Sequence, residues 1–377
     1  MMLDLQEIRK DIDDVDRQIV DLIEKRMSLT SAVAKYKIET GKKVLDTERE
    51  KAKLAAISCM VGKEENKHGV NELFTQIMAM SRKQQYGLLE RMGNTLREDY
   101  EAVDELDTKN CKVVYQGVPG AYSHIAVRRF FGKEVENFNV STFRDAMEAV
   151  KTGEADYAVL PIENSTAGII GDTYDLLQEY NHYIVAETYV KVEHALLGLP
   201  GTKLEDIKVV YSHPQGLMQC AKFLDEHRQW QQIGQPNTAM SAKRVLEEGN
   251  KEHAAIASIE AAELYNLEVL REHIISDDAN TTKFVIISNK RRFVKGAKKM
   301  AICFETPNTS GSLYDMLSHI IYNELNMTKI ESRPIEDKAW QFRFFVEFMG
   351  NIDDFNVMSA LRGIEEEALS IKLLGNY

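Results

Sequence analysis

Apolar residues recur at steps of three and four along the first forty residues, and the pattern continues until Gly41. This spacing predicts one long α-helix that ends at that glycine. At about 1.5 Å per residue the helix would run roughly 50 Å, which is longer than a single small domain needs. We therefore expect a second chain to lie against the apolar row. The row consists of Leu5, Ile8, Ile12, Val15, Ile19, Leu22, Leu29, Val33 and Tyr36.

Two further helices follow in the same segment. Asp46 is a plausible N-cap for the second helix, and the third is expected from about Val70 to Met92, with Leu73, Ile77 and Leu88 on its apolar side. Residues 1–92 are thus predicted to be all-α. The acidic, mostly polar stretch at 93–110 is typical of a linker.

The composition limits what the protein can bind. The chain has 377 residues and a formal net charge of -12, so no overall basic field gathers nucleic acid or anionic lipid. The opening residues lack the apolar core of a signal peptide, and no later stretch reaches a length that spans a membrane, so we expect a cytoplasmic protein. The four cysteines are scattered, which argues against a zinc knot or a disulfide framework.

After residue 111 the pattern changes to strand, loop and helix in repetition. Through 111–292 it predicts an α/β segment with mostly parallel sheets, and its length indicates two lobes. Residues 298–377 instead predict strand, helix, strand, strand, helix and strand. That βαββαβ order is the ferredoxin-like, α+β plait.

Charged and polar residues interrupt the apolar side of the helical segment. Arg26 occupies the next position of the apolar row after Leu22, and Lys37 lies three turns later on nearly the same face. The third helix places Ser81 and Gln85 on its apolar side. One explanation is a coiled-coil dimer in which a buried arginine fixes the register. Several polar residues from three helices favour the other explanation, a cationic pocket for a small dicarboxylate.

These residues resemble the AroQ-type chorismate mutases, which are intertwined helical dimers. By that resemblance, Arg26 and the partner chain's Arg9 would hold the substrate carboxylates, and Lys37 and Gln85 would donate to the ether oxygen. Asp46 and Glu50 would meet the ring hydroxyl. The reaction is an intramolecular rearrangement that needs a compressed conformer and well-placed donors, so an acid–base pair is not required. The matching positions are Arg9, Arg26, Lys37, Asp46, Arg49, Glu50, Ser81 and Gln85.

In the α/β segment, hydroxyl, amide and imidazole side chains follow the predicted strands, where open sheets bind ligands. Each one alone has an ordinary explanation as a helix cap, a turn residue or a strand start. The candidates for substrate binding are Ser123, Glu163, Asn164, Ser165, Thr166, Ser212, His213, Gln215, Thr281 and Lys283.

Together the strings GVPGAYS, VLPIENSTAG, YSHPQ and NTTKF resemble the prephenate dehydratase family, a two-lobed fold like that of periplasmic binding proteins. The resemblance implies that the substrate binds between the lobes. Thr282 would be the hydroxyl that assists departure of the ring hydroxyl as carboxylate is lost and the ring becomes aromatic. The family commonly has arginine where this chain has Lys283, which keeps the charge but loses the two-pronged fit to a carboxylate.

The C-terminal plait resembles an ACT domain, which in this context binds phenylalanine as a feedback inhibitor. From the fold alone, a plain dimerisation domain is the simpler explanation. Family members often have proline where this chain has Ser310. The residues carried over as the allosteric site are Gly311, Ser312, Leu313, Tyr314, Glu331, Ser332, Arg333 and Pro334.

The resemblances together imply a cytoplasmic, multidomain enzyme that converts chorismate through prephenate to phenylpyruvate. The expected domains are a mutase at 1–92, a linker at 93–110, a dehydratase at 111–292 and a regulatory domain at 298–377. The expected partners are the two substrates, phenylalanine and further copies of the chain as a homodimer or larger assembly, with no metal or organic cofactor, nucleic acid or membrane. The alternative is a non-catalytic, ligand-binding regulator with a helical dimerisation segment, and the lack of a basic helix-turn-helix pattern weighs against it.

Overall fold

The computed structural model describes residues 4–91, 100–336 and 338–377. Its contacts divide the chain into two compact units. The first joins the described N-terminal residues to Cys303–Ile371, and the second contains Tyr100–Ile302 with Lys372–Tyr377. The helical segment and most of the C-terminal segment, which are far apart in sequence, therefore form one unit.

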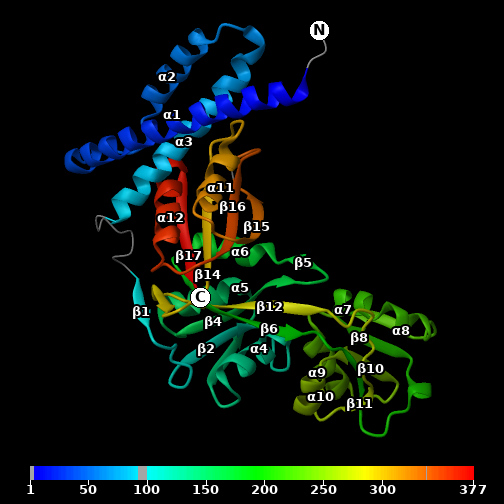
Figure 1. Cartoon of the computed structure of the whole chain (residues 1–377). Helices are drawn as coiled ribbons and strands as arrows, with labels where there is room; N and C mark the ends of the chain where they lie inside the picture. The colour runs from blue at the N-terminus through cyan, green and yellow to red at the C-terminus, as the bar shows by residue number, and fades with distance from the viewer. Residues whose placement is uncertain (1–3, 92–99, 337) are drawn as a thin grey trace. The chain divides into compact units, whose positions relative to one another are not determined.

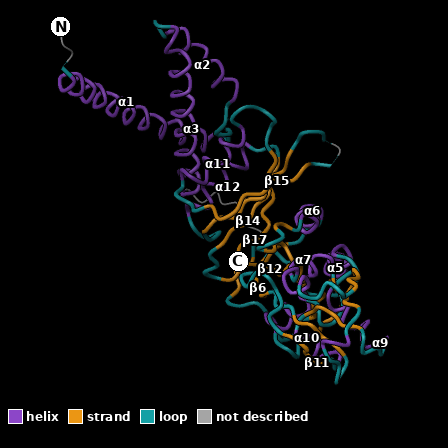
Figure 2. The backbone as a smooth tube through the Cα atoms, turned by 90° about the vertical axis from the view of Figure 1, so that its right-hand side faces the viewer, coloured by secondary structure: helices purple, strands orange, loops and turns teal. Residues whose placement is uncertain are grey.

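The N-terminal segment of the first unit is all-α, as predicted (Figure 2). Helix α1 (Leu5–Thr40) ends where Gly41 adopts a left-handed φ of 67°. Asp46 caps α2 (Thr47–Met60) by accepting from the backbone of Arg49, which confirms the predicted N-cap. A short 3-10 turn, η1 (Glu64–Asn66), leads into α3 (Lys67–Arg91), which begins three residues before the predicted start.

The apolar row of α1 is largely uncovered within one chain. The exposed fraction is 53% for Ile12 and 65% for Leu22, and the only buried residues of the helix are Thr30 and Ala34. Helix α3 is different, because Ile77 and Tyr86 are buried. An apolar face of this length is unusual on a protein surface and is typical of an interaction site.

The C-terminal segment has the predicted βαββαβ order. Its strands and helices are β14 (Lys299–Glu305), α11 (Ser312–Tyr322), β15 (Met327–Pro334), β16 (Phe342–Met349), α12 (Phe355–Glu367) and β17 (Ser370–Asn376). The strand order is β15-β16-β14-β17, as in a ferredoxin-like plait. Helix α12 packs against both α11 and α3, and Arg362 of α12 lies 3.2 Å from the buried Glu90 carboxylate of α3.

The second unit consists of two lobes, as expected. The first lobe contains β2 (Lys112–Gln116), α4 (Tyr122–Phe131), β3 (Glu136–Val140), α5 (Phe143–Thr152), β4 (Tyr157–Asn164), β5 (Gly168–Ile169) and α6 (Gly171–Glu179). Two long strands, β6 (Tyr183–Lys191) and β12 (Thr281–Ser288), complete its sheet in the order β6-β12-β4-β2-β3.

The second lobe is inserted between β6 and β12, which run side by side (Figure 1). Its sheet has the order β11-β7-β10-β8-β9. Its elements are β7 (Ala195–Gly198), η2 (Leu204–Asp206), β8 (Val209–Ser212), α7 (Pro214–Gln219), α8 (Ala221–Asp225), β9 (Gln231–Gly234), α9 (Thr238–Glu248), β10 (His253–Ala257), α10 (Ile259–Tyr265) and β11 (Glu268–Arg271).

The expectation of mostly parallel sheets is wrong, because both sheets are mixed. Strand β12 pairs antiparallel with β4 and β6, and β7 pairs antiparallel with β10 and β11. The chain enters the second lobe through β6 and returns through the neighbouring β12, so these two strands must run in opposite directions. Within the predicted linker, Glu101–Val103 form a strand, β1, that pairs with β13 (Arg292–Val294).

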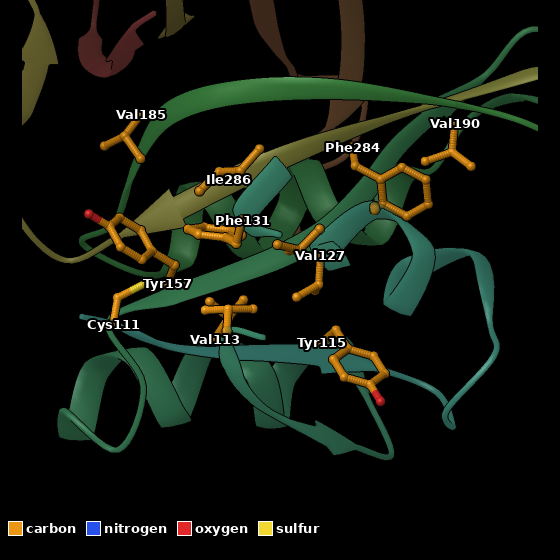
Figure 3. Close-up of a cluster of buried hydrophobic side chains, with 13 residues drawn as sticks. Cys111, Val113, Tyr115, Val127, Phe131, Tyr157, Val185, Val190, Phe284 and Ile286 are labelled. Carbon is orange, nitrogen blue, oxygen red and sulfur yellow. The ribbon is translucent and has the colours of Figure 1, made fainter. Parts of the chain in front are cut away.

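A buried cluster holds β12 in the first lobe (Figure 3). Phe284 and Ile286 of β12 pack in it with Val113 of β2 and Val127 of α4. Because side chains alternate along a strand, Thr282 lies on the same face of β12 as these two anchored residues. The core thus fixes the position of the Thr282 side chain.

None of the helices that the structure describes combines the length and the hydropathy needed to cross a bilayer.

The close approach of α11 and α12 predicts that Gly363→Ala lowers the unfolding temperature. A Cβ at position 363 would overlap the His319 ring, which is buried and has little room to move. Overpacking of this kind costs about 1–3 kcal/mol. Gly69→Ala in α3 is the matched control, because its Cβ would meet nothing within 4 Å and alanine favours helix. Thermal unfolding that is shifted equally by both substitutions would contradict the tight packing of α11 against α12.

Candidate active sites

A pocket in the first unit lies among α1, α2 and α3. Seven of the eight predicted helical site residues line it, and Arg9 is the exception, since it lies exposed near the start of α1. The pocket combines cations, carboxylates and one amide, that of Gln85, with an apolar wall. The lining residues are Arg26, Leu29, Thr30, Val33, Lys37, Val44, Asp46, Arg49, Glu50, Lys53, Met78, Ser81, Arg82 and Gln85.

The cations of this pocket are partly desolvated. Arg26 donates to the hydroxyl of Ser81 and, at 3.4 Å, to the carbonyl of Ile77. Burial lowers the pKa of Arg26, and the nearby Glu50 carboxylate only partly offsets this effect. The pKa of Lys37 is lowered as well, chiefly by burial, although Asp46 opposes the shift. Removing water from cations strengthens their attraction for an anion that enters the pocket.

Gln85 holds a fixed amide at the pocket wall. Its Nε2 donates to the backbone carbonyl of Ser81 at 3.1 Å, and the side chain is buried. An amide nitrogen carries two protons, so one remains for a ligand. Ser81 in turn donates to Ile77 O at 2.8 Å.

Sequence reasoning missed Arg82, which also lines the pocket. Its Nη1 donates to both carboxylate oxygens of Glu50 at 2.8 and 2.7 Å, while its Nε donates to Glu367 of α12 at 2.7 Å. The pairing could not be predicted because Glu367 lies 285 residues away. The one signal in the sequence was the position of Arg82, which directly follows Ser81 on a helix with a buried side.

A second pocket is the cleft between the two lobes of the α/β unit. Five of the predicted residues line it: Ser123, Asn164, His213, Gln215 and Thr282. Ala121 and Asn237, the N-caps of α4 and α9, line it too, so the positive ends of two helix dipoles face the cleft. The full lining is Gln116, Ala121, Tyr122, Ser123, Pro161, Asn164, Ile170, Val192, His194, His213, Gln215, Gly216, Gln219, Pro236, Asn237, Thr238, Thr282 and Phe284.

Asn164 orients the hydroxyl of Thr282. The Oδ1 atom of Asn164 accepts from the backbone of Thr166 and Ala167, at 3.1 and 2.8 Å, which fixes the amide. Its Nδ2 then donates to Thr282 Oγ1 at 2.9 Å. Because Oγ1 accepts this hydrogen bond, the proton of the Thr282 hydroxyl is available to a ligand in the cleft.

His194 is a cleft residue that sequence reasoning missed. Its side chain is buried, with Nε2 3.0 Å from Gln219 Oε1 and Nδ1 3.1 Å from the Tyr122 hydroxyl. Burial lowers the pKa of His194, which favours the neutral imidazole. His194 follows strand β6, and it was overlooked because residues 183–191 were not identified as a strand.

Six predicted residues of the α/β segment are not in the cleft lining: Glu163, Ser165, Thr166, Ser212, Thr281 and Lys283. Alternation along β12 explains the last two, since Thr281 and Lys283 lie on the face opposite Thr282. The Lys283 ammonium lies 3.2 Å from Glu187, which also pairs with Lys299 at 2.6 Å. Ser212 is fully buried and donates to Ile256 O at 2.8 Å.

A third pocket lies at the start of α11. Gly311, Ser312, Leu313 and Tyr314 line it, whereas the predicted residues Glu331, Ser332, Arg333 and Pro334 lie on β15, outside the lining. Gly311 adopts a left-handed φ of 86°, which glycine tolerates best. The lining residues not predicted are Thr306, Pro307, Asn308, Thr309, Trp340, Gln341, Phe342 and Phe344.

Two segments of the chain match models of known families. The family model of chorismate mutase type II matches residues 8–86, and that of prephenate dehydratase matches residues 113–292. These ranges contain the helix pocket and the interlobe cleft, respectively.

Similar proteins cover nearly the whole chain. The bifunctional chorismate mutase/prephenate dehydratase of Enterobacter agglomerans is 31% identical over 98% of this chain and 95% of its own length. Among solved structures, prephenate dehydratase from Arthrobacter aurescens in complex with L-Phe has a TM-score of 0.66 and 28% identity, covering 71% of this chain and 89% of its own. A protein described as a novel type of quorum quenching acylase has a TM-score of 0.65 and 33% identity, covering 70% and 96%.

Both family matches, and the near full-length similarity to the Enterobacter enzyme, agree with the two sites that the geometry separates. The chain belongs to the family of bifunctional chorismate mutase/prephenate dehydratases, enzymes of aromatic amino acid biosynthesis.

Proposed function

We propose that the helix pocket rearranges chorismate to prephenate and that the interlobe cleft then converts prephenate to phenylpyruvate. The observation that carries the second assignment is the hydrogen bond from Asn164 to Thr282, because it leaves the threonine proton directed to the substrate. The first assignment is supported by the seven predicted residues that meet in one pocket.

In the mutase pocket, Arg26 would bind a substrate carboxylate, and Lys37 and Gln85 would donate to the ether oxygen as its bond to carbon breaks. Negative charge develops on that oxygen in the transition state, so fixed donors stabilise it more than the ground state. Asp46 and Glu50 would hold the ring hydroxyl, while Arg49 and Ser81 complete the wall.

The exposed row on α1 supports a homodimer, or a larger assembly built from it. In the proposed assembly, the partner's copy of α1 covers the row and supplies Arg9 to the pocket. This arrangement explains why Arg9 lies outside the lining within one chain.

In the dehydratase cleft, Thr282 would donate to the ring hydroxyl as it departs. The bond to the ring carboxylate would break and its electron pair would enter the ring, while the carbon–oxygen bond of the ring hydroxyl breaks with its electrons on oxygen. Carbon dioxide would leave, the departing oxygen would take the Thr282 proton and leave as water, and Thr282 would regain a proton from solvent. Ser123, His213 and Gln215 would orient the substrate, and the helix N-termini at Ala121 and Asn237 would attract its carboxylates. The predicted residues outside the lining would support the surrounding loops and strands, without touching prephenate.

The C-terminal segment is proposed to be an ACT domain that binds phenylalanine at the start of α11. The Arthrobacter dehydratase was solved with L-Phe, and the pocket at α11 combines backbone groups at Gly311 with aromatic side chains at Trp340 and Phe342. The proposed functional domains keep the limits 1–92, 111–292 and 298–377. A cytoplasmic location is part of the same proposal.

Thr282→Ala should lower dehydratase kcat by at least ~100-fold, the usual scale for a positioned proton donor. Mutase activity of the same protein should stay intact. Thr281→Ala is the matched control, because its hydroxyl donates to Ala279 O at 3.2 Å and does not line the cleft. Steady-state rates of both reactions test this, and equal loss of the two activities in Thr282→Ala would contradict the separate sites.

Gln85→Glu should nearly abolish mutase activity near neutral pH, because an ionised carboxylate cannot donate to the ether oxygen. As the pH falls through the pKa of the new carboxyl group, it gains a proton and activity should partly return. Mutase kcat/KM measured between pH 8 and pH 5 tests this, with the dehydratase rate as an internal control. A variant whose mutase rate is unaffected, or does not rise on acidification, would argue against the donor role.

Phenylalanine should inhibit the dehydratase, and Gly311→Ala should raise the concentration needed for half-inhibition. Alanine is strained at a φ of 86°, so the loop should shift. Gly296→Ala is the control, because that glycine has a similar φ of 79° and open space but lies outside the pocket. The measurement is the dehydratase rate as a function of phenylalanine concentration in the parent and both variants. An unchanged rate of the parent at saturating phenylalanine would contradict the proposed regulation.

A further inference from the structure

The last turn of α12 carries two glutamates, Glu366 and Glu367, that face the mutase segment. Carboxylates at a helix C-terminus are disfavoured by the helix dipole. Both are nevertheless tied to the mutase segment, since the carboxylate of each accepts hydrogen bonds from residues of the first 91. The unfavourable interaction of Glu366 and Glu367 with the dipole of α12 is thus offset by hydrogen bonds from the N-terminal helical segment.

Glu367 fixes the guanidinium that in turn holds Glu50. Arg82 Nε and Nη2 donate to the two oxygens of Glu367 at 2.7 and 3.3 Å, a two-pronged contact that sets the plane of the guanidinium. The remaining nitrogen, Nη1, then donates to both oxygens of Glu50. Burial disfavours charge on Glu367, yet His319 and Arg82 lower its pKa to about 2, so it stays ionised.

Glu366 fixes the turn between α1 and α2. One of its oxygens accepts from the backbone N–H groups of Val44 and Leu45, each at 3.1 Å. Lys37 donates to the carbonyl of Val44, and Asp46 follows the same turn. The turn thus places both side chains relative to the pocket.

We propose that Glu366 and Glu367 are positioning residues for the mutase reaction, so that α12 completes a pocket otherwise formed by the N-terminal helices. Glu367 acts through Arg82 on Glu50, and Glu366 acts through the turn on Lys37. The inference rests on the proposed roles of Glu50 and Lys37. Neither glutamate lines the pocket, so neither touches the substrate.

Glutamine substitutions separate this role from a general contribution to folding. In Glu366→Gln the amide oxygen can still accept from Val44 and Leu45, so mutase activity should stay within about threefold of the parent. Glu366→Ala removes both backbone hydrogen bonds, together with the one from the Tyr86 hydroxyl at 3.4 Å, and should lower mutase kcat at least tenfold through Lys37. In Glu367→Gln an N–H group faces the donors of Arg82, so mutase KM should rise at least tenfold through Glu50.

The experiment uses the full-length chain and measures mutase kcat and KM, dehydratase rate and unfolding temperature for each variant. Glu365→Gln is the matched control, because Glu365 is exposed on the same turn of α12. Glu50→Gln is the reference for loss of the proposed contact to substrate. Dehydratase activity should stay close to the parent in all of these variants. The unfolding temperature should stay close to the parent in Glu365→Gln and Glu366→Gln, and it should fall in Glu367→Gln and Glu50→Gln, because the buried Arg82 loses one of its two carboxylate partners.

Three results would overturn the inference. Mutase parameters that are unchanged in Glu367→Gln and Glu366→Ala would show that α12 does not act on the pocket. Equal losses in Glu366→Gln and Glu366→Ala would assign the effect to charge and not to the hydrogen bonds accepted from the backbone of Val44 and Leu45. A variant in which mutase and dehydratase activities fall by the same factor would show that the loss of mutase activity is due to impaired folding. An unaffected Glu50→Gln variant would instead refute the proposed role of Glu50 in the pocket, and with it the basis of the inference.

Discussion

The Arg82 guanidinium is buried between the carboxylates of Glu50 and Glu367 and connects three helices of the first unit. A buried arginine without anionic partners would be strongly destabilising, so this charge constrains where α2 and α12 can lie against α3. Burial lowers the pKa of Arg82, but the two carboxylates more than compensate and raise it above its ordinary value. The Arg82 guanidinium therefore stays charged, and in the proposed account its two ion pairs set the shape of the mutase pocket.

In the second unit, which contains the two α/β lobes, the chain connections between the lobes determine the direction of β6 and β12. A lobe inserted between two neighbouring strands requires those strands to run antiparallel, and the start of the returning strand then lies at the mouth of the cleft. Thr282 occupies that start, while Phe284 and Ile286 on the same face are buried in the first lobe. The apolar cluster thus holds the strand, and Asn164 sets the direction of the hydroxyl. In the proposed reaction, a neutral hydroxyl held in this way would assist departure of the ring hydroxyl without a tuned pKa.

Local signals in the sequence predicted much of this architecture. Gly41 and Asp46 mark helix ends through their own backbone and side-chain chemistry, and the periodicity of α3 correctly placed Ser81 and Gln85 on its buried side. The order of strand and helix patterns along residues 298–377 likewise predicted the βαββαβ arrangement, because each pattern depends on neighbouring residues. Signals of this kind act within a few residues, so they can be read from one sequence.

Long-range pairing could not be predicted in that way. Arg82 gains its role from Glu367, which no local pattern connects to it, and His194 was missed because strand β6 was not identified. Lys283 was predicted to bind substrate because it follows Thr282 in sequence. In the structure its ammonium lies 3.2 Å from Glu187, on the face of β12 opposite Thr282. The helix N-termini at the cleft, and not that cation, supply positive potential there.

The role of Arg82 is tested most directly by a double-mutant cycle on mutase kcat/KM between Glu50→Gln and Glu367→Gln. If Glu367 acts only by holding Arg82 against Glu50, the double variant should be no worse than the more impaired single variant. Losses that multiply would show that the two carboxylates act independently, and would contradict the central role of Arg82 in shaping the mutase pocket.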